Sequence, residues 1–314
     1  MKTRRFPLLF ASMVLLLLYA CKTSRVINST ELTITGNYCA PAAAFSNSQD
    51  TIPLKNTDSL IKANPDLPVH EVLMANATGT LFLIRQMKGI AGDTSLEGMM
   101  RRAELRSKIQ HRLLLATMEI AGVAAELDCE GEKADQLAKY LDNFNSKRNT
   151  RLTVASIITG ALTTIATVAI REQGPQNVVA IGGGLLSAGL GALTINAAGK
   201  KIRFAHLRNV LSDIWYMPDT SAIYPPFTWY VLNEKHFSNS GQISLAANVK
   251  KRWERFDLGG DVSTSDKQLF FGEGGVYKAD DLHTRAAMVN ELQSTVRSVN
   301  QDLQRLLHYL ITIE

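Results

Sequence analysis

The sequence predicts a mainly α fold: an elongated helical bundle with a central glycine-rich hydrophobic helical hairpin and a small mixed or β-containing insert. Three observations predict this fold class. Two uncharged apolar runs, residues 152–170 and 178–199, flank a short polar turn. Apolar residues recur at helical spacing before and after this stretch, over residues 68–151 and 279–314. Residues 215–278 are instead rich in aromatics, prolines and glycines, which indicates the insert.

The charge distribution favours a membrane surface over a nucleic acid as the partner. The 314 residues carry 34 Lys and Arg against 29 Asp and Glu, a net charge of +5, and most of these charges are scattered. One basic cluster flanks the hairpin, and its members are Lys147, Arg148, Arg151, Lys200, Lys201 and Arg203. No aromatic stacking platform or nucleic-acid-binding motif accompanies it. Basic flanks beside apolar helices suit an anionic lipid surface, so membrane lipid is the expected partner.

The first 21 residues have the organisation of a secretory signal peptide. A positive segment at residues 2–5 precedes an apolar stretch at residues 8–19 that is too short to span a membrane comfortably. The stretch ends in Leu18-Tyr19-Ala20-Cys21. This tetrapeptide resembles the lipobox of bacterial lipoproteins. The resemblance covers only residues 1–21, and no family is recognised for the mature chain.

The lipobox resemblance implies cleavage before Cys21, lipidation of that cysteine with acyl chains such as palmitate, and stable anchoring in the cell envelope. Because Lys22 rather than Asp follows, the sorting pattern of bacterial lipoproteins implies the periplasmic face of the outer membrane more than the inner membrane. Residues 22–67 are rich in Ser, Thr, Asn, Asp and Pro and are expected to form a flexible tether, with a short helix near residues 58–63. An exported compartment permits a disulfide between Cys39 and Cys129, and the sequence leaves their pairing open.

Residues 68–151 are predicted to form amphipathic helices. The first has an apolar face formed by Leu73, Ala77, Thr80, Ile84 and Met87. Thr94 or Ser95 can cap the next helix, which is expected to run to about Leu127. Cys129-Glu130-Gly131 predicts a turn. A third helix follows and is expected to continue into the first apolar run, because neither Pro nor Gly separates them.

The hairpin, residues 152–199, is the main candidate functional element. Each apolar run is long enough to cross the hydrocarbon core of a bilayer as a helix, and the polar turn at residues 171–177 would make the two helices antiparallel. Small residues at four-residue spacing permit close packing of helices inside a membrane. The candidate membrane residues are Leu152, Gly160, Ile170, Val178, Gly183, Gly184 and Gly191.

Two features oppose simple cotranslational insertion of the hairpin. Thr, Gly and Ser make its runs only moderately apolar, and the positive-inside rule would place its basic base in the cytoplasm, whereas an exported lipoprotein has that base in the periplasm. Three alternatives resolve the conflict: the bundle buries the hairpin, the hairpin inserts after folding, or Cys21 is not a lipidation site. Insertion after folding resembles, in layout only, the helical pore-forming toxins of the haemolysin E type. The glycine-rich run could also drive oligomerisation through a ring of helices.

No catalytic, cofactor or metal site is predicted. Residues 178–187 resemble the strand and glycine-rich turn of a dinucleotide-binding fold, but a basic segment replaces the acidic residue expected about 20 residues later. None of the six histidines has zinc-ligand spacing to another His or Cys. Motifs of serine hydrolases, zinc proteases and phosphate-binding loops are absent from the sequence. We therefore expect no enzyme activity, no cofactor and no small-molecule substrate.

After the hairpin, a helix is expected over residues 200–214, followed by the insert at residues 215–278. Strands are predicted at residues 227–232 and 268–271, the latter pairing with residues 275–278. The aromatic residues of the insert form either its packed core or a belt at a membrane surface. They are Trp215, Tyr216, Tyr224, Phe227, Trp229 and Tyr230.

Residues 279–314 give the clearest soluble helix. Asp280 or Asp281 can start it, and apolar residues then alternate three and four apart. The resulting heptad seam consists of Val289, Leu292, Val296, Val299, Leu303, Leu306, Leu310 and Ile313. Such a seam packs within its own bundle or forms a coiled coil with another chain, which leaves a homo-oligomer or partner helices open.

These features together predict a non-enzymatic, lipid-anchored protein of the bacterial cell envelope, acting as a membrane-associated structural or interaction component. The alternative is an α-helical pore-forming or membrane-perturbing protein that deploys the hairpin. Release of dye from liposomes separates the two, because only the alternative opens a path for solutes.

Overall fold

The computed structural model describes residues 26–28, 38–41, 53–195 and 199–312. These residues form two compact units. The hairpin unit contains residues 138–203, 26–28 and 276–279. The body contains residues 38–41, 53–137, 204–275 and 280–312. The predicted lipidation site, Cys21, lies outside the described residues.

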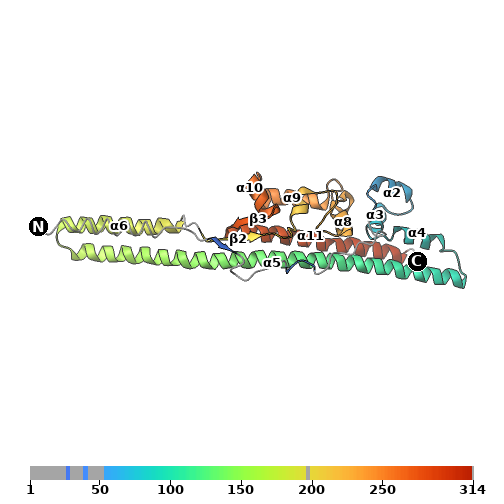
Figure 1. Ribbon diagram of the computed structural model, residues 1–314, viewed down its shortest axis with the longest axis horizontal. Coiled ribbons are helices and arrows are strands. Elements are labelled where there is room, and N and C mark those ends of the chain that lie inside the picture. The colour runs from blue at the N-terminus through green and yellow to red at the C-terminus, as the bar shows by residue number, and fades with distance from the viewer. Residues whose placement is uncertain (1–25, 29–37, 42–52, 196–198, 313–314) are drawn as a thin grey trace. The chain divides into compact units, whose positions relative to one another are not determined.

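The described chain is mainly helical, as the sequence predicts (Figure 1). The α-helices are α2 (Thr57–Ala63), α3 (Val69–Ala77), α4 (Leu81–Gly89), α5 (Leu96–Ala169), α6 (Gln173–Ile195), α7 (Ser212–Tyr216), α8 (Pro226–Asn233), α9 (Leu245–Arg252), α10 (Thr264–Asp266) and α11 (Ala279–Thr312). A 3-10 helix, η3 (Lys235–Phe237), and two π-helices, η4 (Trp253–Asp257) and η5 (Lys267–Phe271), complete the helical elements described. The strands are β1 (Val26–Asn28), β2 (Lys201–Ala205) and β3 (Gly274–Tyr277).

The core of the body lies where α11 packs along the first part of α5. Asp280 and Asp281 occupy the first turn of α11, where their negative charges stabilise the helix by interacting with the positive end of its dipole. The seven described residues of the heptad seam, from Val289 to Leu310, are at most 6% exposed. The Gln293 side chain donates to the Ala124 carbonyl at 3.2 Å and to Asp128 Oδ1 at 2.7 Å. The seam is therefore buried within its own chain, and Ile313 lies outside the described residues.

The predicted turn at residues 129–131 is wrong, because α5 is continuous there. A Cβ atom on Gly131 would lie 2.7 Å from Asn290 Oδ1 of α11. The glycine therefore permits a close approach of two helices and does not end one. The prediction that the helix continues into the first apolar run is confirmed.

The helices before α5 are also shorter than predicted. A single helix over residues 69–87 is wrong, because Gly79 has a φ of +66° and separates α3 from α4. The short helix near residues 58–63 is confirmed as α2. Ser95 caps α5 as predicted, since its Oγ accepts a hydrogen bond from the Gly98 N–H at 3.1 Å.

The helix predicted for residues 200–214 is wrong up to residue 211, because residues 201–205 form β2 and α7 begins only at Ser212. Ile202 and Phe204 are buried there, while Arg203 between them is exposed, so the segment alternates with the period of a strand. The sheet order is β1-β2-β3, and β1 pairs in parallel with β2.

The insert is more helical than predicted. Residues 227–232 lie in α8 and residues 268–271 in η5, so both predicted strands are wrong. Pro226 at the start of α8 is a helix-start signal, since its fixed φ suits the first turn. The strand predicted at residues 275–278 is confirmed as β3, but its neighbour is β2.

The aromatic residues of the insert mainly form its core, so the interpretation as a membrane belt is wrong for most of them. Trp215 stacks on Phe271 with ring centroids 4.0 Å apart, and Tyr224 stacks on Trp229 at 5.7 Å. Phe227 is also buried, whereas Tyr216 is 59% exposed.

Candidate membrane interface

The hairpin consists of the last part of α5 and all of α6. The two helices are long and apolar enough to cross a membrane. The uncharged run of residues 152–170 would measure about 28 Å at 1.5 Å per residue, close to the thickness of a bilayer hydrocarbon core. The predicted turn at residues 171–177 is shorter in the structure, where α5 ends at Ala169 and α6 begins at Gln173. Pro175 is accommodated in the first turn of α6, where a missing N–H disrupts no intrahelical bond.

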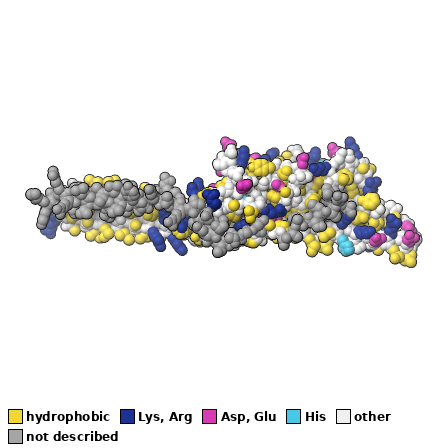
Figure 2. All heavy atoms as spheres, viewed as in Figure 1, with side chains coloured by type: hydrophobic (Ala, Val, Ile, Leu, Met, Phe, Trp, Pro, Cys, Tyr) yellow, Lys and Arg dark blue, Asp and Glu magenta, His cyan; other side chains and the backbone are white. Residues whose placement is uncertain are grey.

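Large apolar side chains of the hairpin face outward (Figure 2). Those most exposed are Val154, Ile157, Ile158, Leu162, Ile165 and Val168 of α5, and Val178, Ile181, Leu185 and Leu193 of α6, with exposed fractions of 37–82%. The alternative in which the bundle buries the hairpin is therefore wrong for the described residues. They bury at most 6% of either apolar segment. Apolar patches of this extent mark sites of protein or membrane interaction.

Small and hydroxyl-bearing residues form the seam between the two helices. Ser156 Oγ donates to the Ser187 carbonyl at 2.8 Å, and Ser187 Oγ donates to the Ser156 carbonyl at 3.0 Å. Gly160 lies beside this pair, since a Cβ atom there would be 3.4 Å from Ser187 Oγ. Reciprocal hydrogen bonds of this kind can hold two helices together inside a membrane, where no hydrophobic effect drives the helices into contact.

The predicted small residues do not all lie in this seam. A Cβ atom on Gly183 would lie 1.9 Å from Thr163 Oγ1, and one on Gly191 would lie 3.8 Å from Ser156 Oγ. Gly184 faces away, with nothing within 4 Å of the Cβ position. The remaining predicted residues mark the ends of the runs: Leu152 and Ile170 are half-buried and Val178 is exposed.

The threonine hydroxyls of the runs bond to the helix backbone. Each hydroxyl donates to a backbone carbonyl three or four residues earlier, at 2.6–3.0 Å between the two oxygens. The pairs, with the donor first, are Thr159 and Ala155, Thr163 and Thr159, Thr164 and Gly160, Thr167 and Thr164, and Thr194 and Gly191. Near the tip, Gln176 Nε2 of α6 donates to the Thr167 carbonyl of α5 at 2.8 Å. These bonds reduce the cost of moving hydroxyl and amide groups out of water. Sequence pattern alone does not identify Thr163 and Thr167 as seam residues, because a threonine in an apolar run indicates only a cost of insertion.

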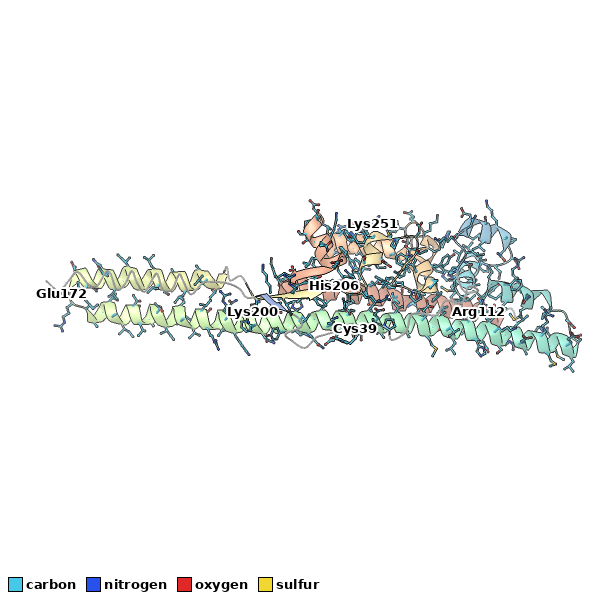
Figure 3. The ribbon with its side chains drawn as sticks, in the orientation of Figure 1. Cys39, Arg112, Glu172, Lys200, His206 and Lys251 are labelled. Carbon is cyan, nitrogen blue, oxygen red and sulfur yellow. A yellow bond between two sulfur atoms is a disulfide. The ribbon has the colours of Figure 1, made fainter. Side chains whose placement is uncertain are left out.

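The base of the hairpin is fixed by contacts among its own residues. The Lys200 N–H donates to Asn145 Oδ1 at 2.8 Å, and the Lys200 ammonium lies 3.4 Å from the centroid of the Phe144 ring. Gly199 permits this approach, because a Cβ atom there would lie 2.6 Å from Asn145 Nδ2. Figure 3 shows Lys200 at the base and Glu172 at the tip, so the polar groups occupy the two ends of the apolar runs.

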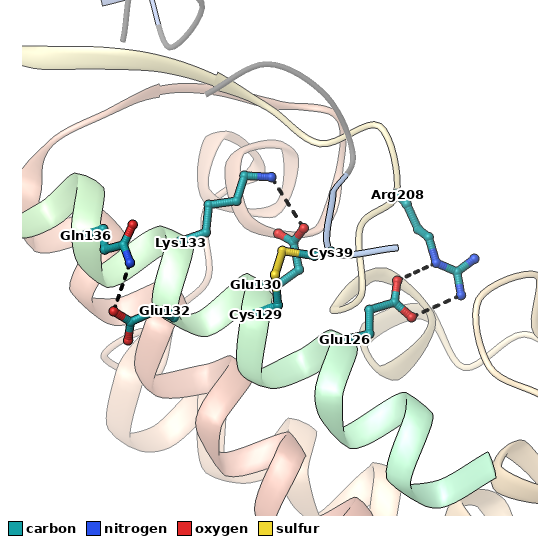
Figure 4. The surroundings of a disulfide bond; sticks show 8 residues. All are labelled: Cys39, Glu126, Cys129, Glu130, Glu132, Lys133, Gln136 and Arg208. Atoms are coloured by element: carbon teal, nitrogen blue, oxygen red, sulfur yellow. Dashed lines mark hydrogen bonds and ion pairs between the residues drawn. A yellow bond between two sulfur atoms is a disulfide. The ribbon is translucent and has the colours of Figure 1, made fainter. Parts of the chain in front are cut away.

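Cys39 and Cys129 form a disulfide in the body, which answers the pairing question that the sequence left open. Beside it, Lys133 pairs with Glu130 at 3.4 Å, and Arg208 Nε donates to Glu126 Oε1 at 2.7 Å (Figure 4). Lys133 and both glutamates are buried, so the pairs satisfy charges that would be costly alone. These interactions join segments of the body.

One histidine of the body, His206, lies near two cationic side chains and stays neutral. The pKa of His206 is lowered to about 2, mainly by burial and in addition by the nearby positive charges of Arg285 and Lys133. Arg285 is fully buried, and it donates to the Phe270 carbonyl at 2.9 Å and to Asn209 Oδ1 at 3.2 Å. The cluster therefore links α11 to the insert.

The body contains a groove in which two of the ionisable side chains are already paired. This groove of about 670 Å³ is lined mainly by residues 217–226 and α8. Its Arg208 is bound to Glu126, and its Glu234 pairs with His236 at 2.6 Å. No group of three or more His, Cys, Asp or Glu side chains among the described residues is placed to hold a metal ion. Residues 178–187 lie within α6, so they form no strand and phosphate-binding turn.

No known protein family, curated protein or solved structure matches this chain.

Proposed function

We propose that the chain is a non-enzymatic, lipid-anchored protein of the bacterial cell envelope that inserts its hairpin into a lipid bilayer as a structural or interaction component. One observation carries the proposal. The hairpin places large apolar side chains on its outside, whereas Gly160, Gly183 and most of its serine and threonine hydroxyls lie in the seam or against the backbone. This polarity is the reverse of that expected for helices in water.

The size of the apolar surface supports a lipid environment. Complete burial of a Leu, Ile or Val side chain contributes about 1.5–3 kcal/mol. Ten partly exposed side chains of this kind therefore favour transfer of the hairpin into hydrocarbon by an amount on the order of 10 kcal/mol. The hydroxyl groups oppose transfer less than their number implies, because their hydrogen bonds are already made within the hairpin.

The lipobox at Cys21 and the basic base support attachment to an envelope membrane. Two or three acyl chains on one cysteine hold a protein on a bilayer stably, and Lys or Arg near an anionic surface adds about 1 kcal/mol each. Insertion after export accounts for the charge pattern, because the positive-inside rule describes insertion during synthesis.

Pore formation is the alternative function, and the hairpin geometry favours anchoring over it. A helical pore needs a polar helix face along the water path. Most polar side chains of the hairpin instead lie in its seam or bond to its own backbone, while the outer face carries Ile, Leu and Val. We therefore expect no release of dye from liposomes at protein concentrations that saturate binding.

Flotation with anionic liposomes tests insertion independently of the acyl anchor, using residues 22–314. Leu162→Lys places a charge within the first apolar run, where Leu162 is 61% exposed. A lysine at the centre of a membrane helix costs about 2.5–3.5 kcal/mol, so liposome binding is expected to fall about 100-fold. Leu115→Lys is the matched control on the same helix, with 63% exposure in the body, and it is expected to bind like the parent protein.

Equal binding of the parent and Leu162→Lys proteins would contradict insertion of the hairpin. Loss of binding in both lysine variants would also contradict insertion of the hairpin, because binding would then depend equally on a residue of the body. Circular dichroism on each variant checks that the helical content is unchanged. Dye release by the parent protein would favour the pore-forming alternative.

A further inference from the structure

The strand pairing at the hairpin base limits how far the proposed lipidation site lies from it. Val26 of β1 pairs with Lys201 of β2. Val26 is five residues after Cys21. A chain spans at most about 3.6 Å per residue, so Cys21 lies within about 18 Å of Val26. Acyl chains on Cys21, which the lipobox resemblance implies, would therefore be attached within about 18 Å of the Val26–Lys201 pair.

The direction of the strands brings the anchor to the hairpin side of the sheet. α6 ends at Ile195, and the chain then reaches the start of β2 at Lys201. Because β1 and β2 run in parallel, the N-terminal end of β1 lies beside the N-terminal end of β2 (Figure 1). The chain from Cys21 thus joins the sheet at the end where the hairpin also joins it.

The chemistry of the base suits a bilayer surface. Lys147, Arg148 and Arg151 are exposed on α5 just before the first apolar run, and Lys200 and Lys201 are half-exposed after the second. Cationic side chains at the end of a membrane helix are stabilised when they lie among anionic lipid headgroups. The tip carries only Arg171 and Glu172 as charged residues, so little charge has to cross the hydrocarbon.

We propose that the hairpin enters the same bilayer that holds the Cys21 lipid, from the same face, with its base at the headgroups and its tip on the opposite side. This inference rests on the proposed function and adds the identity of the membrane and the orientation. A hairpin inserted in a second membrane would require two bilayer surfaces within about 18 Å of each other at the base. The short connection from Cys21 to β1 therefore excludes a bridge between well-separated membranes.

Cysteine accessibility in a bacterium with two membranes tests the inference on the full-length, acylated protein. Gln173→Cys places a thiol at the tip and Ser146→Cys places one at the base, both at exposed positions. The parent protein is the background control, because Cys21 is acylated and Cys39 and Cys129 are paired. A membrane-impermeant maleimide is applied to intact cells, to cells with a permeabilised outer membrane, and to lysed cells.

Membrane fractionation records which membrane holds the acylated protein. For an outer-membrane anchor, we expect Gln173→Cys to be labelled on intact cells and Ser146→Cys only after outer-membrane permeabilisation. Lys22→Asp follows the lipoprotein sorting pattern and is expected to move the anchor to the inner membrane. The tip should then be labelled only after lysis, and the base again after permeabilisation.

Two different failures are distinguishable. If tip and base are labelled at the same step in every form, the hairpin crosses no membrane and the proposed function fails as well. If tip and base are separated by a membrane other than the one that fractionation assigns to the anchor, only the same-bilayer inference fails. Without relocation by Lys22→Asp, the fractionated parent form still decides between these outcomes.

Discussion

The body and the hairpin use the same helix in opposite ways. In the body, α5 buries Ile120, Val123 and Leu127 against its neighbours, and its polar residues face water or form buried ion pairs. In the hairpin, α5 packs the half-buried Ser156 and Gly160 against α6 and exposes Ile157 and Leu162. One continuous helix therefore has an apolar buried face in the body and an apolar outer face in the hairpin, which is the arrangement that the proposed membrane insertion requires.

The contrast also separates two sources of stability. The body depends on burial of apolar side chains, which is driven by water. A hairpin in lipid gains nothing from that effect between its helices, so its association depends on close packing and hydrogen bonds such as those of Ser156 and Ser187. Substitutions of the same type should therefore have different effects in the two regions.

The largest expected effect concerns the disulfide of the body. Cys39 and Cys129 are 90 residues apart, and the chain-entropy treatment assigns about 4.5 kcal/mol to closing a loop of this size. We expect Cys39→Ser with Cys129→Ser to lower the free energy of unfolding in urea by about 4 kcal/mol. Reductant should lower the stability of the parent by the same amount and leave the double variant unchanged. A loss below about 1 kcal/mol would mean that the disulfide constrains little of the unfolded chain.

The next effect compares two Leu→Ala substitutions. Leu292 is fully buried in the heptad seam, so Leu292→Ala should lower the free energy of unfolding by about 3 kcal/mol. Leu162→Ala removes a side chain that is 61% exposed and should leave that value unchanged within about 0.5 kcal/mol. Urea denaturation followed by circular dichroism measures both. Similar losses in the two variants would remove the distinction between the regions.

A smaller effect compares two neighbouring glycines of α6. Gly183→Val places carbon atoms against Thr163, where a Cβ alone would lie 1.9 Å from Oγ1, and overpacking of this kind costs about 1–3 kcal/mol. Gly184→Val meets open space and is the matched control. Disulfide formation between Ser156→Cys and Ser187→Cys reports the seam, since the two hydroxyl oxygens are 3.3 Å apart. We expect about tenfold slower crosslinking with Gly183→Val only. Equal rates would show that the seam tolerates a larger residue.

The smallest effect is the pH dependence of the body. The folded-state pKa of His206 is about 2, mainly because of burial, against about 6.5 in an unfolded chain. The unfolded chain thus binds more protons between these values, so stability is lost as pH falls below about 6.5. From pH 7 to pH 6 the loss from this group is about 0.7 kcal/mol. His206→Gln should remove that part of the slope, and His111→Gln at an exposed position should not. Identical slopes in all three proteins would contradict a neutral His206 in the folded state.

Much of the architecture could be predicted from local pattern. The apolar runs, the start of α11 and its heptad seam all follow from spacing along one helix, and the structure has them where expected. The small residues Gly160, Gly183 and Gly191 could likewise be assigned to helix packing. Gly184 could not be distinguished from Gly183, because the angular position of the partner helix decides which glycine is covered.

The errors arise where a distant contact decides a local conformation. Gly131 has the appearance of a helix break, but Asn290 occupies the space where its side chain would be. The segment at residues 201–205 follows a helix in sequence and becomes a strand because β1, far away in the chain, pairs with it. In α8, the aromatic residues favour a strand, whereas Pro226 at its start indicates a helix.

The proposal that the apolar outer face of the hairpin contacts lipid is tested most directly by measuring the environment of position 162 with and without a membrane. An environment-sensitive fluorophore is attached at Leu162→Cys in residues 22–314, and at Leu115→Cys as the equally exposed control. With anionic liposomes, we expect the emission of the label at position 162 to shift to the blue and to be quenched by lipids brominated in their acyl chains. The label at position 115 should show neither change. A label at position 162 that remains in water, or two labels that respond alike, would contradict the proposal that the hairpin inserts into lipid.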